Sequence, residues 1–142
     1  MAKLPQNISV VLSDISEGML RDVRRRIDND SRFAFQAFDC HRIPFASDSF
    51  DLVIANHVLF YCKDISKVCR EVSRVLIPGG TFLCSTYGAS HMQEITALVQ
   101  EFDSRIQLSG DALYARFGLE NGAEILAPYF SDISTRLYDD AL

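Results

Sequence analysis

The sequence predicts an α/β fold: a doubly wound, mostly parallel sheet that lies in one domain. Three features predict it. Short β-branched apolar runs alternate with amphipathic helical stripes, polar side chains follow several of these runs, and the clearest helical stripe stops at a Pro-Gly-Gly segment. Strands that alternate with helices join through right-handed crossovers, which makes the sheet parallel and covers both of its faces. We find no internal repeat or linker, so residues 1–142 are expected to form a single domain.

Composition narrows the function classes. The chain has 142 residues, of which 48% are apolar, and this is enough for one core of ordinary density. Its formal net charge of -5 argues against a nucleic-acid-binding surface, because such a surface needs clustered cations. No apolar run reaches the roughly 18 residues of a membrane span. We therefore expect a soluble protein with a small-molecule substrate and with neither nucleic-acid nor membrane partners.

The cysteines give no sign of a metal site. They occur singly within apolar runs, without the paired short spacing of zinc sites and without a secretory signal before them. They are Cys40, Cys62, Cys69 and Cys84. We expect buried thiols in a protein of the reducing cytoplasm, and no metal ligands.

The first strand is predicted at residues 8–12, a β-branched run bounded by Pro5 and Asp14. A helix follows, with apolar residues at helical spacing up to Ile27 and with Ser16 capping its first turn. Four arginines occupy much of the remaining helix surface, which we interpret as a solvated face. They are Arg21, Arg24, Arg25 and Arg26.

The middle of the chain predicts two more strands and a helix. The strands are expected at residues 33–38, just before Asp39, and at residues 50–55, with a loop and a polar turn between them. The helix starts near Asp64 and stops at the Pro-Gly-Gly segment 78–80. Its apolar stripe consists of Ile65, Val68, Cys69, Val72, Val75 and Leu76.

The rest of the chain predicts four elements. A strand is expected at residues 81–86 and an amphipathic helix over residues 92–102. A short helix near 119–126 and a strand at 133–138 complete the prediction.

Polar residues at strand ends are candidate ligand contacts, because doubly wound sheets bind ligands beyond the carboxyl ends of their strands. Asp14 follows the first strand, where a carboxylate can accept hydrogen bonds from both hydroxyls of a ribose; a charge at a helix N-terminus is the alternative. Asp39 follows the second strand, where it can accept from the exocyclic amine of adenine while the amide of Cys40 donates to a ring nitrogen. A turn-forming aspartate is the alternative there.

Further polar and aromatic residues follow the later strands. Asn56, His57 and Val58 come after the third strand, which is expected to bring them to the same crevice. Three others either line a substrate pocket or are half-buried packing residues. They are Tyr61, Tyr87 and His91.

The order of three stretches resembles the class I S-adenosylmethionine-dependent methyltransferases that act on small molecules, including those that methylate quinone precursors. The stretches are VVLSDISEGML, FQAFDCHRIPFASDSFDLVIANHVLFY and VCREVSRVLIPGGTFLCSTYG. The resemblance covers about residues 8–88. It implies a Rossmann-like fold, S-adenosylmethionine as cofactor and methyl transfer to a small-molecule acceptor.

The resemblance also implies roles for individual residues. Asp14 resembles the ribose ligand with Ile15 beside the adenine, and Asp39 and Cys40 resemble the pair at the adenine edge. The predicted cofactor-binding residues are Asp14, Ile15, Ser16, Asp39, Cys40, Asn56, His57 and Val58. Methyl transfer from a sulfonium is a direct displacement that depends on alignment and desolvation, so no catalytic residue is predicted. His57 would act as a base only toward an acceptor that holds a proton.

One departure from the family is large. Its first strand ends in a glycine-rich loop that lets the backbone approach the methionine part of the cofactor, and no G-x-G motif occurs here. We expect the chain to be an N-terminally truncated domain that lacks this strand and loop, and to lack a final strand as well. The strands at 8–12 and 50–55 would then have unpaired edges, and we hypothesise a homodimer that covers them.

Three functions compete. The first is methyl transfer by the parent domain, with this chain inactive or weakly active alone. The second is a non-catalytic subunit or binding module that a partner chain completes. The third is a nucleotide-dependent dehydrogenase, which requires a glycine fingerprint about 20 residues upstream of the acid and does not explain Asp39 or the Pro-Gly-Gly segment.

Overall fold

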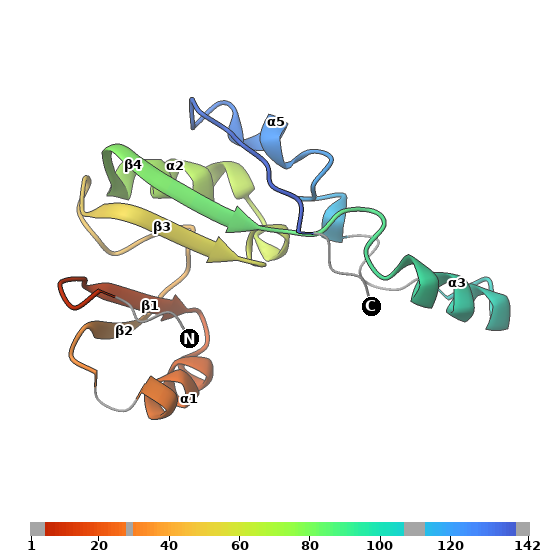
Figure 1. The fold of residues 1–142 in the computed structure, drawn as a ribbon, viewed down its shortest axis with the longest axis horizontal. Helices are drawn as coiled ribbons and strands as arrows, with labels where there is room; N and C mark the ends of the chain where they lie inside the picture. The colour runs from red at the N-terminus through yellow and green to blue at the C-terminus, as the bar shows by residue number, and fades with distance from the viewer. Residues whose placement is uncertain (1–4, 28–29, 107–112, 139–142) are drawn as a thin grey trace. The chain divides into compact units, whose positions relative to one another are not determined.

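Pairs of parallel strands are the basis of the fold. The computed structural model describes residues 5–27, 30–106 and 113–138, and its contacts group into two units, Met1–Pro44 and Phe45–Leu142. The first unit contains β1 (Val10–Asp14), α1 (Glu17–Ile27) and β2 (Phe33–Ala37) (Figure 1). The second contains β3 (Phe50–Asn56), η1 (Leu59–Tyr61), α2 (Ile65–Val75), β4 (Leu76–Ser85), α3 (Gln93–Phe102) and α5 (Gly122–Leu126). Parallel strands that alternate with helices confirm the predicted fold class.

In the first unit, β1 and β2 form a parallel pair joined by α1. Their register runs from Val10 opposite Phe33 to Asp14 opposite Ala37. The predicted position of the first strand, 8–12, is two residues too early. Polar Ser13 and Asp14 stay in the strand because β2 continues beside them, and Asp14 also accepts a hydrogen bond from the Phe38 amide at 3.2 Å.

Helix α1 has the predicted cap and the predicted solvated face. The amide of Met19 donates to Ser16 Oγ at 3.4 Å. The side chains of Arg21 and Arg25 are 66% and 78% exposed. Their ion pairs with acidic residues of the same helix are surface pairs of the kind that contributes little to stability.

The turn before β2 contains an ion pair. Arg32 donates two hydrogen bonds through Nε and Nη2 to the carboxylate of Asp30, and its Nη1 donates to the Pro5 carbonyl at 3.0 Å. These hydrogen bonds lower the pKa of Asp30 from 3.8 to about 2. The side chain of Arg32 thus connects the segment before β1 to the start of β2.

In the second unit, β3 and β4 pair in parallel, and here one prediction is wrong. The strand after α2 does not begin at residue 81: β4 already begins at Leu76, and the Pro-Gly-Gly segment is an irregularity inside it. Gly79 has a φ of +78°, and a Cβ on Gly80 would lie 2.9 Å from the Ile77 carbonyl oxygen. These two glycines let the strand bulge and then resume pairing at Thr81.

Helix α2 begins as predicted but ends at Val75, before the Pro-Gly-Gly segment, so Leu76 of the predicted stripe belongs to β4. Asp64 accepts a hydrogen bond from the Lys67 amide at 2.9 Å and so caps the first turn. Four residues of the predicted apolar stripe are buried on this helix: Val68, Cys69, Val72 and Val75. Burial raises the pKa of the Cys69 thiol to about 11, so this cysteine is a packing residue.

Two of the four cysteines differ from the prediction of buried thiols. All four are outside disulfides, but only Cys62 and Cys69 are buried, whereas Cys40 and Cys84 are partly exposed. Cys40 lies in a turn after β2, where less packing surrounds it than in a helix stripe.

The centre of the second unit is packed around η1. Leu59 and Phe60 are 0% and 2% exposed, and Phe117 is 1% exposed. Thr86 Oγ1 donates to the Phe117 carbonyl at 2.7 Å, and Arg116 donates to the Cys62 carbonyl at 2.7 Å. These bonds attach the segment that precedes α5 to the end of β4 and to η1.

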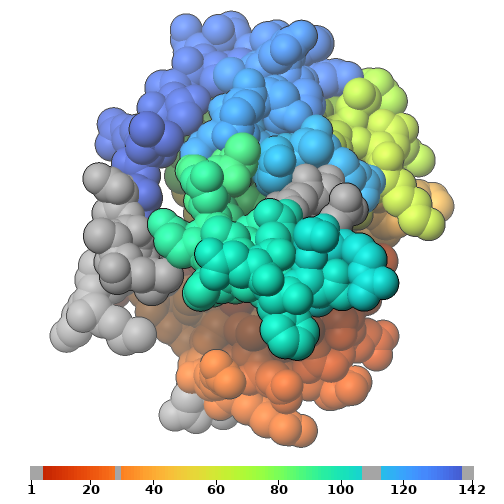
Figure 2. All heavy atoms as spheres, turned by 90° about the vertical axis from the view of Figure 1, so that its right-hand side faces the viewer, coloured from red at the N-terminus to blue at the C-terminus, as the bar shows by residue number. Residues whose placement is uncertain are grey.

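Several apolar surfaces of the second unit stay uncovered. α3 is a helix as predicted, but Leu98 and Phe102 are 67% and 90% exposed, and Figure 2 shows α3, in teal, facing the viewer. Leu52, Ile54 and Leu83 are 42%, 56% and 51% exposed. They lie on one face of the β3–β4 pair, because Ile54 and Leu83 are register partners and Leu52 stands two residues before Ile54. The expected covering of both sheet faces is therefore not observed for this pair within the described residues.

The last part of the chain differs from the prediction. Described residues 133–138 form no strand, and the side chains of Leu137 and Tyr138 are 77% and 90% exposed. A strand needs a neighbour for its hydrogen bonds, and no described strand pairs with this segment. The short helix predicted at 119–126 is present but begins only at Gly122, as α5. Among the described helices, none has the length and hydropathy of a membrane span.

Candidate functional site

The carboxyl ends of β1 and β2 form the edge that carries the two predicted carboxylates. Asp14 is the last residue of β1 and lies opposite Ala37, the last residue of β2. Asp39 follows two residues after Ala37. Parallel pairing therefore brings Asp14 and Asp39 to the same edge of this sheet, as the sequence predicts.

One carboxylate oxygen of Asp14 accepts a hydrogen bond within the protein, and the other is available to a ligand. Its Oδ1 accepts a hydrogen bond from the Ser16 amide at 2.8 Å, which places the carboxylate at the start of α1. The alternative role at a helix N-terminus is therefore present in the structure. Within the described parts of the chain, no other donor is seen on this carboxylate, so its second oxygen can accept from a ligand.

An apolar surface lies next to this carboxylate. Ile15 directly follows Asp14, and its side chain is 75% exposed. Ser16 is also exposed, with its Oγ directed to the Met19 amide as the helix cap. An exposed isoleucine beside a carboxylate suits the flat face of a base linked to a ribose.

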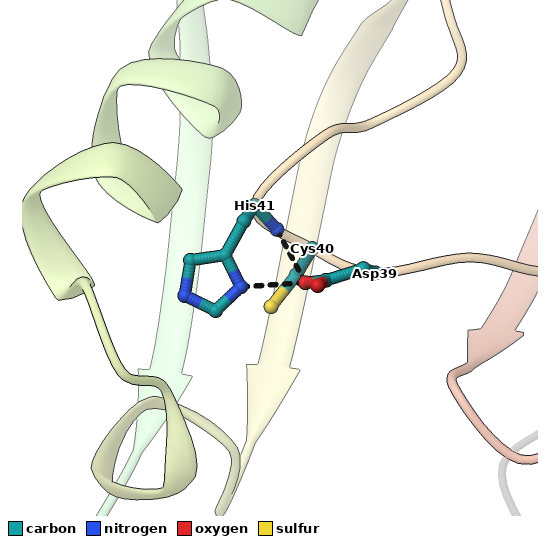
Figure 3. A group of neighbouring side chains, drawn as sticks. All are labelled: Asp39, Cys40 and His41. Atoms are coloured by element: carbon teal, nitrogen blue, oxygen red, sulfur yellow. Dashed lines mark hydrogen bonds and ion pairs between the residues drawn. The ribbon is translucent and has the colours of Figure 1, made fainter.

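Asp39 opens a tight turn, so the alternative role proposed for it is also present. Its carbonyl accepts a hydrogen bond from the Arg42 amide, and its Oδ1 accepts one from the His41 amide, both at 2.9 Å. Its side chain is 55% exposed. Figure 3 shows the His41 ring directed at this carboxylate. The His41 Nδ1 atom lies 2.5 Å from Asp39 Oδ1. His41 is not among the predicted site residues, although it stands two residues after a candidate aspartate.

The end of β3 carries the second group of predicted residues. The amide of His57 donates to both the carbonyl oxygen and the Oγ of Ser85, at 3.2 Å and 3.1 Å. Ser85 Oγ in turn donates to Asn56 Oδ1 at 3.4 Å. Ser85 was missed in the sequence because its closeness to Asn56 depends on the register of β3 and β4. Val58 follows and is 39% exposed.

His57 has an unusual backbone conformation. Its φ is 51°, in the left-handed region that non-glycine residues rarely adopt. The two hydrogen bonds that the His57 amide donates to Ser85 hold the backbone there, and such conformations concentrate at functional sites. This strain is a signal that the sequence could not reveal.

An aromatic stack adjoins His57. The rings of His57 and Tyr87 are 6.3 Å apart, and those of Tyr87 and His91 are 4.7 Å apart, both stacked. Desolvation, with a smaller contribution from Tyr61, raises the pKa of Tyr87. Tyr87 is half-buried, in keeping with the packing alternative, whereas Tyr61 and His91 are exposed.

The predicted site residues thus fall into two sets. The first unit holds Asp14, Ile15, Ser16, Asp39 and Cys40 at the end of its strand pair. The second unit holds Asn56, His57 and Val58 at the end of β3.

Comparisons with known proteins place these residues in a family. The family model described as "Methyltransferase domain" matches residues 1–84. A malonyl-[acyl-carrier protein] O-methyltransferase of Methylovorus sp. is 31% identical, over 94% of this chain and 48% of the relative. The ubiquinone/menaquinone biosynthesis C-methyltransferase UbiE of Rickettsia massiliae is 36% identical, over 55% of this chain and 33% of the relative. The chain therefore spans about half the length, or less, of these relatives.

Solved structures of methyltransferases also resemble this chain. An S-adenosylmethionine-dependent methyltransferase from Mesorhizobium loti is 32% identical, with a TM-score of 0.53 over 59% of this chain and 38% of that one. A Haloferax volcanii methyltransferase, solved in complex with the Trm112 methyltransferase activator, is 26% identical, with a TM-score of 0.62 over 84% of this chain and 49% of that one. Because the family model matches more than half of the chain, the protein belongs to the methyltransferase domain family.

Proposed function

We propose that this chain carries the adenosine-side contacts of an S-adenosylmethionine-dependent methyltransferase that acts on a small-molecule acceptor. The observation that carries the proposal is the placement of Asp14 and Asp39 at one sheet edge, with exposed Ile15 beside the first. The family match supports methyl transfer, and the Mesorhizobium protein supports the identity of the cofactor. The partly and fully buried thiols are in keeping with the reducing cytoplasm, where we place the protein.

The residues of the first unit fit the adenosine part of this cofactor. The open oxygen of Asp14 would accept from the ribose hydroxyls, and Ile15 would pack against the adenine ring. Asp39 would accept from the exocyclic amine, and the amide of Cys40 would donate to a ring nitrogen. When bound, the cofactor supplies an electrophilic methyl group on a sulfonium.

The residues of the second unit would line the pocket rather than exchange protons. Asn56 and Val58 would contact the cofactor, and the strained backbone of His57 would fix the direction of its ring. Displacement at a methyl group requires alignment and exclusion of water, and with the cofactor bound the His57–Tyr87 stack would form part of the wall that excludes it. We therefore assign no catalytic acid or base.

Calorimetry with cofactor fragments tests the proposal. No G-x-G motif occurs in these 142 residues, so we expect the adenosine half to account for most of the affinity and methyl transfer by this chain alone to be slow. S-adenosylhomocysteine and adenosine should both bind, with affinities within about tenfold of each other, and methionine should give no heat. Absence of S-adenosylhomocysteine binding would contradict the proposal, as would binding of methionine without adenosine.

A second candidate function is a binding module that a partner chain completes. The exposed apolar face made by Leu52, Ile54 and Leu83 favours it, because monomeric proteins seldom leave such a patch uncovered. The Haloferax methyltransferase was solved with an activator protein, which supports the idea that relatives of this fold accept partners. Separately, we propose that a second copy of this chain covers the apolar face; such a copy cannot supply a G-x-G loop, because these 142 residues contain none.

Self-association is tested by changing the charge of this face. β3 pairs only with β4 among the described strands, so its outer edge and the adjacent apolar face can be buried together in a homodimer. We expect light scattering to give the mass of a dimer for the wild type and of a monomer for Ile54→Lys. Leu98→Lys on α3, at an apolar position that is 67% exposed against 56% for Ile54, is the control and should stay dimeric. A wild-type monomer at every concentration, or dissociation by Leu98→Lys alone, would refute the homodimer.

A further inference from the structure

The turn after β2 gathers three different donor groups in consecutive residues. One ligand atom each from Asp39, Cys40 and His41 lies within 4.8 Å of the other two. Figure 3 shows the carboxylate, the sulfur and the imidazole on the same side of the turn. The sequence did not predict a metal site here, because adjacent residues have none of the spacing that marks zinc ligands.

We propose that Asp39, Cys40 and His41 form a binding site for a borderline divalent cation of the Zn²⁺ and Co²⁺ class. Thiolate, imidazole and carboxylate together are the donors that such ions prefer, whereas Mg²⁺ and Ca²⁺ take oxygen donors alone. Three protein donors leave a fourth position for water, as in open zinc sites.

The distances allow an ion to enter after a small adjustment. A tetrahedral ion with bonds of about 2.0–2.3 Å holds its donors roughly 3.5 Å apart. The widest donor pair, at most 4.8 Å apart, therefore has to close by up to about 1.3 Å, and His41 Nδ1 and Asp39 Oδ1, now 2.5 Å apart, have to separate by about 1 Å. The ion would take the place of the proton between His41 Nδ1 and Asp39 Oδ1, and the Cys40 thiol would lose its proton on binding.

The turn itself limits the entropy lost on binding. The Arg42 amide closes the backbone onto the Asp39 carbonyl, and the His41 amide fixes the carboxylate through Oδ1, both at 2.9 Å. The His41 side chain is only 20% exposed, so its ring is already restricted. Donors that are held near their final positions bind with less ordering cost.

The proposed ion would affect the proposed cofactor site. Asp39 and Cys40 are the residues that we assign to the adenine edge, so a bound cation and adenosine would compete. A cation at this turn would then act as a reversible inhibitor of cofactor binding; this consequence, unlike the site itself, rests on the proposed function.

Cobalt spectroscopy on the full chain tests the site. Addition of Co²⁺ should produce a near-ultraviolet sulfur-to-cobalt charge-transfer band together with visible bands of tetrahedral intensity, and Zn²⁺ should displace both. Cys40→Ser should abolish the charge-transfer band, and His41→Gln should weaken Co²⁺ affinity by about tenfold or more. Absence of the band in the wild type, or its persistence in Cys40→Ser, would overturn the proposal.

Matched variants separate this site from other donors. Cys84→Ser changes the other partly exposed thiol, whose pKa is raised by burial, and His91→Gln changes an exposed histidine of the second unit. Both should keep the wild-type cobalt spectrum, and loss of the band in either would overturn the assignment. Asp14→Asn should also keep it, since Asp14 is not a proposed ligand.

Competition links the two sites in a separate measurement. Zn²⁺ should lower the affinity of the wild type for S-adenosylhomocysteine and leave that of Cys40→Ser unchanged. Equal affinity with and without Zn²⁺ would overturn the competition. If S-adenosylhomocysteine binds to no sample, the proposed function fails, and the cobalt spectrum alone decides the metal site.

Discussion

Asp14→Asn is expected to weaken the binding of S-adenosylhomocysteine by about ten- to hundredfold. Asparagine keeps an oxygen that can accept from the Ser16 amide, but it replaces the open carboxylate oxygen with an NH₂ donor. That donor would face the ribose hydroxyls of the proposed cofactor, so a charge-assisted hydrogen bond worth about 1.5–3 kcal/mol would be lost. Calorimetric titration of both proteins with S-adenosylhomocysteine measures the effect.

A second acidic residue of the same helix start provides the control. Glu17→Gln removes the same charge from a side chain that is 78% exposed and whose only ion pair among the described residues is with Arg21. Its affinity should stay within about twofold of the wild type, because an exposed charge is well screened. An equal loss in both variants would indicate a general electrostatic effect and would contradict the assignment of Asp14. An unchanged thermal midpoint in Asp14→Asn would show that the helix start is intact.

Helix α2 shows why part of the fold was predictable. Its cap at Asp64 and its stripe through Val68 and Val75 are local features, and packing agrees with them. The start of β4 at Leu76 was not predictable in this way. A Pro-Gly-Gly segment commonly ends an element, and only pairing with β3 turns it into a bulge inside a strand.

The candidate site was predictable to a similar extent. The position of Asp14 and Asp39 at one sheet edge was predictable because the carboxyl ends of parallel strands share one edge, whatever the details of packing. The bond between Ser85 and the His57 amide depends on strand register, and the positive φ of His57 depends on tertiary contacts. The strand predicted at residues 133–138 was wrong because strand formation also depends on tertiary contacts. A strand-like composition without a pairing neighbour does not form a strand.

Phe60→Ala is expected to lower the free energy of unfolding by about 3–5 kcal/mol, since it removes a large ring from a close-packed core. Phe60 is 2% exposed, and its ring centroid lies 4.6 Å from that of Tyr61 and 5.0 Å from that of Tyr87. The chain has no tryptophan, so urea unfolding followed by circular dichroism is the suitable measurement.

The neighbouring aromatic residue tests whether burial is the cause of this effect. Tyr61→Ala removes a ring of similar size from the same short helix, but that ring is 66% exposed, so we expect a loss of about 1 kcal/mol, mostly from its edge contact with Phe60. Equal losses in the two variants would contradict the assignment of Phe60 to the core. Because Phe60 also supports Tyr87, which stacks on His57, its removal should loosen the aromatic wall. Binding of S-adenosylhomocysteine to Phe60→Ala at low temperature, where the protein is still folded, should therefore fall as well, whereas Tyr61→Ala should keep it.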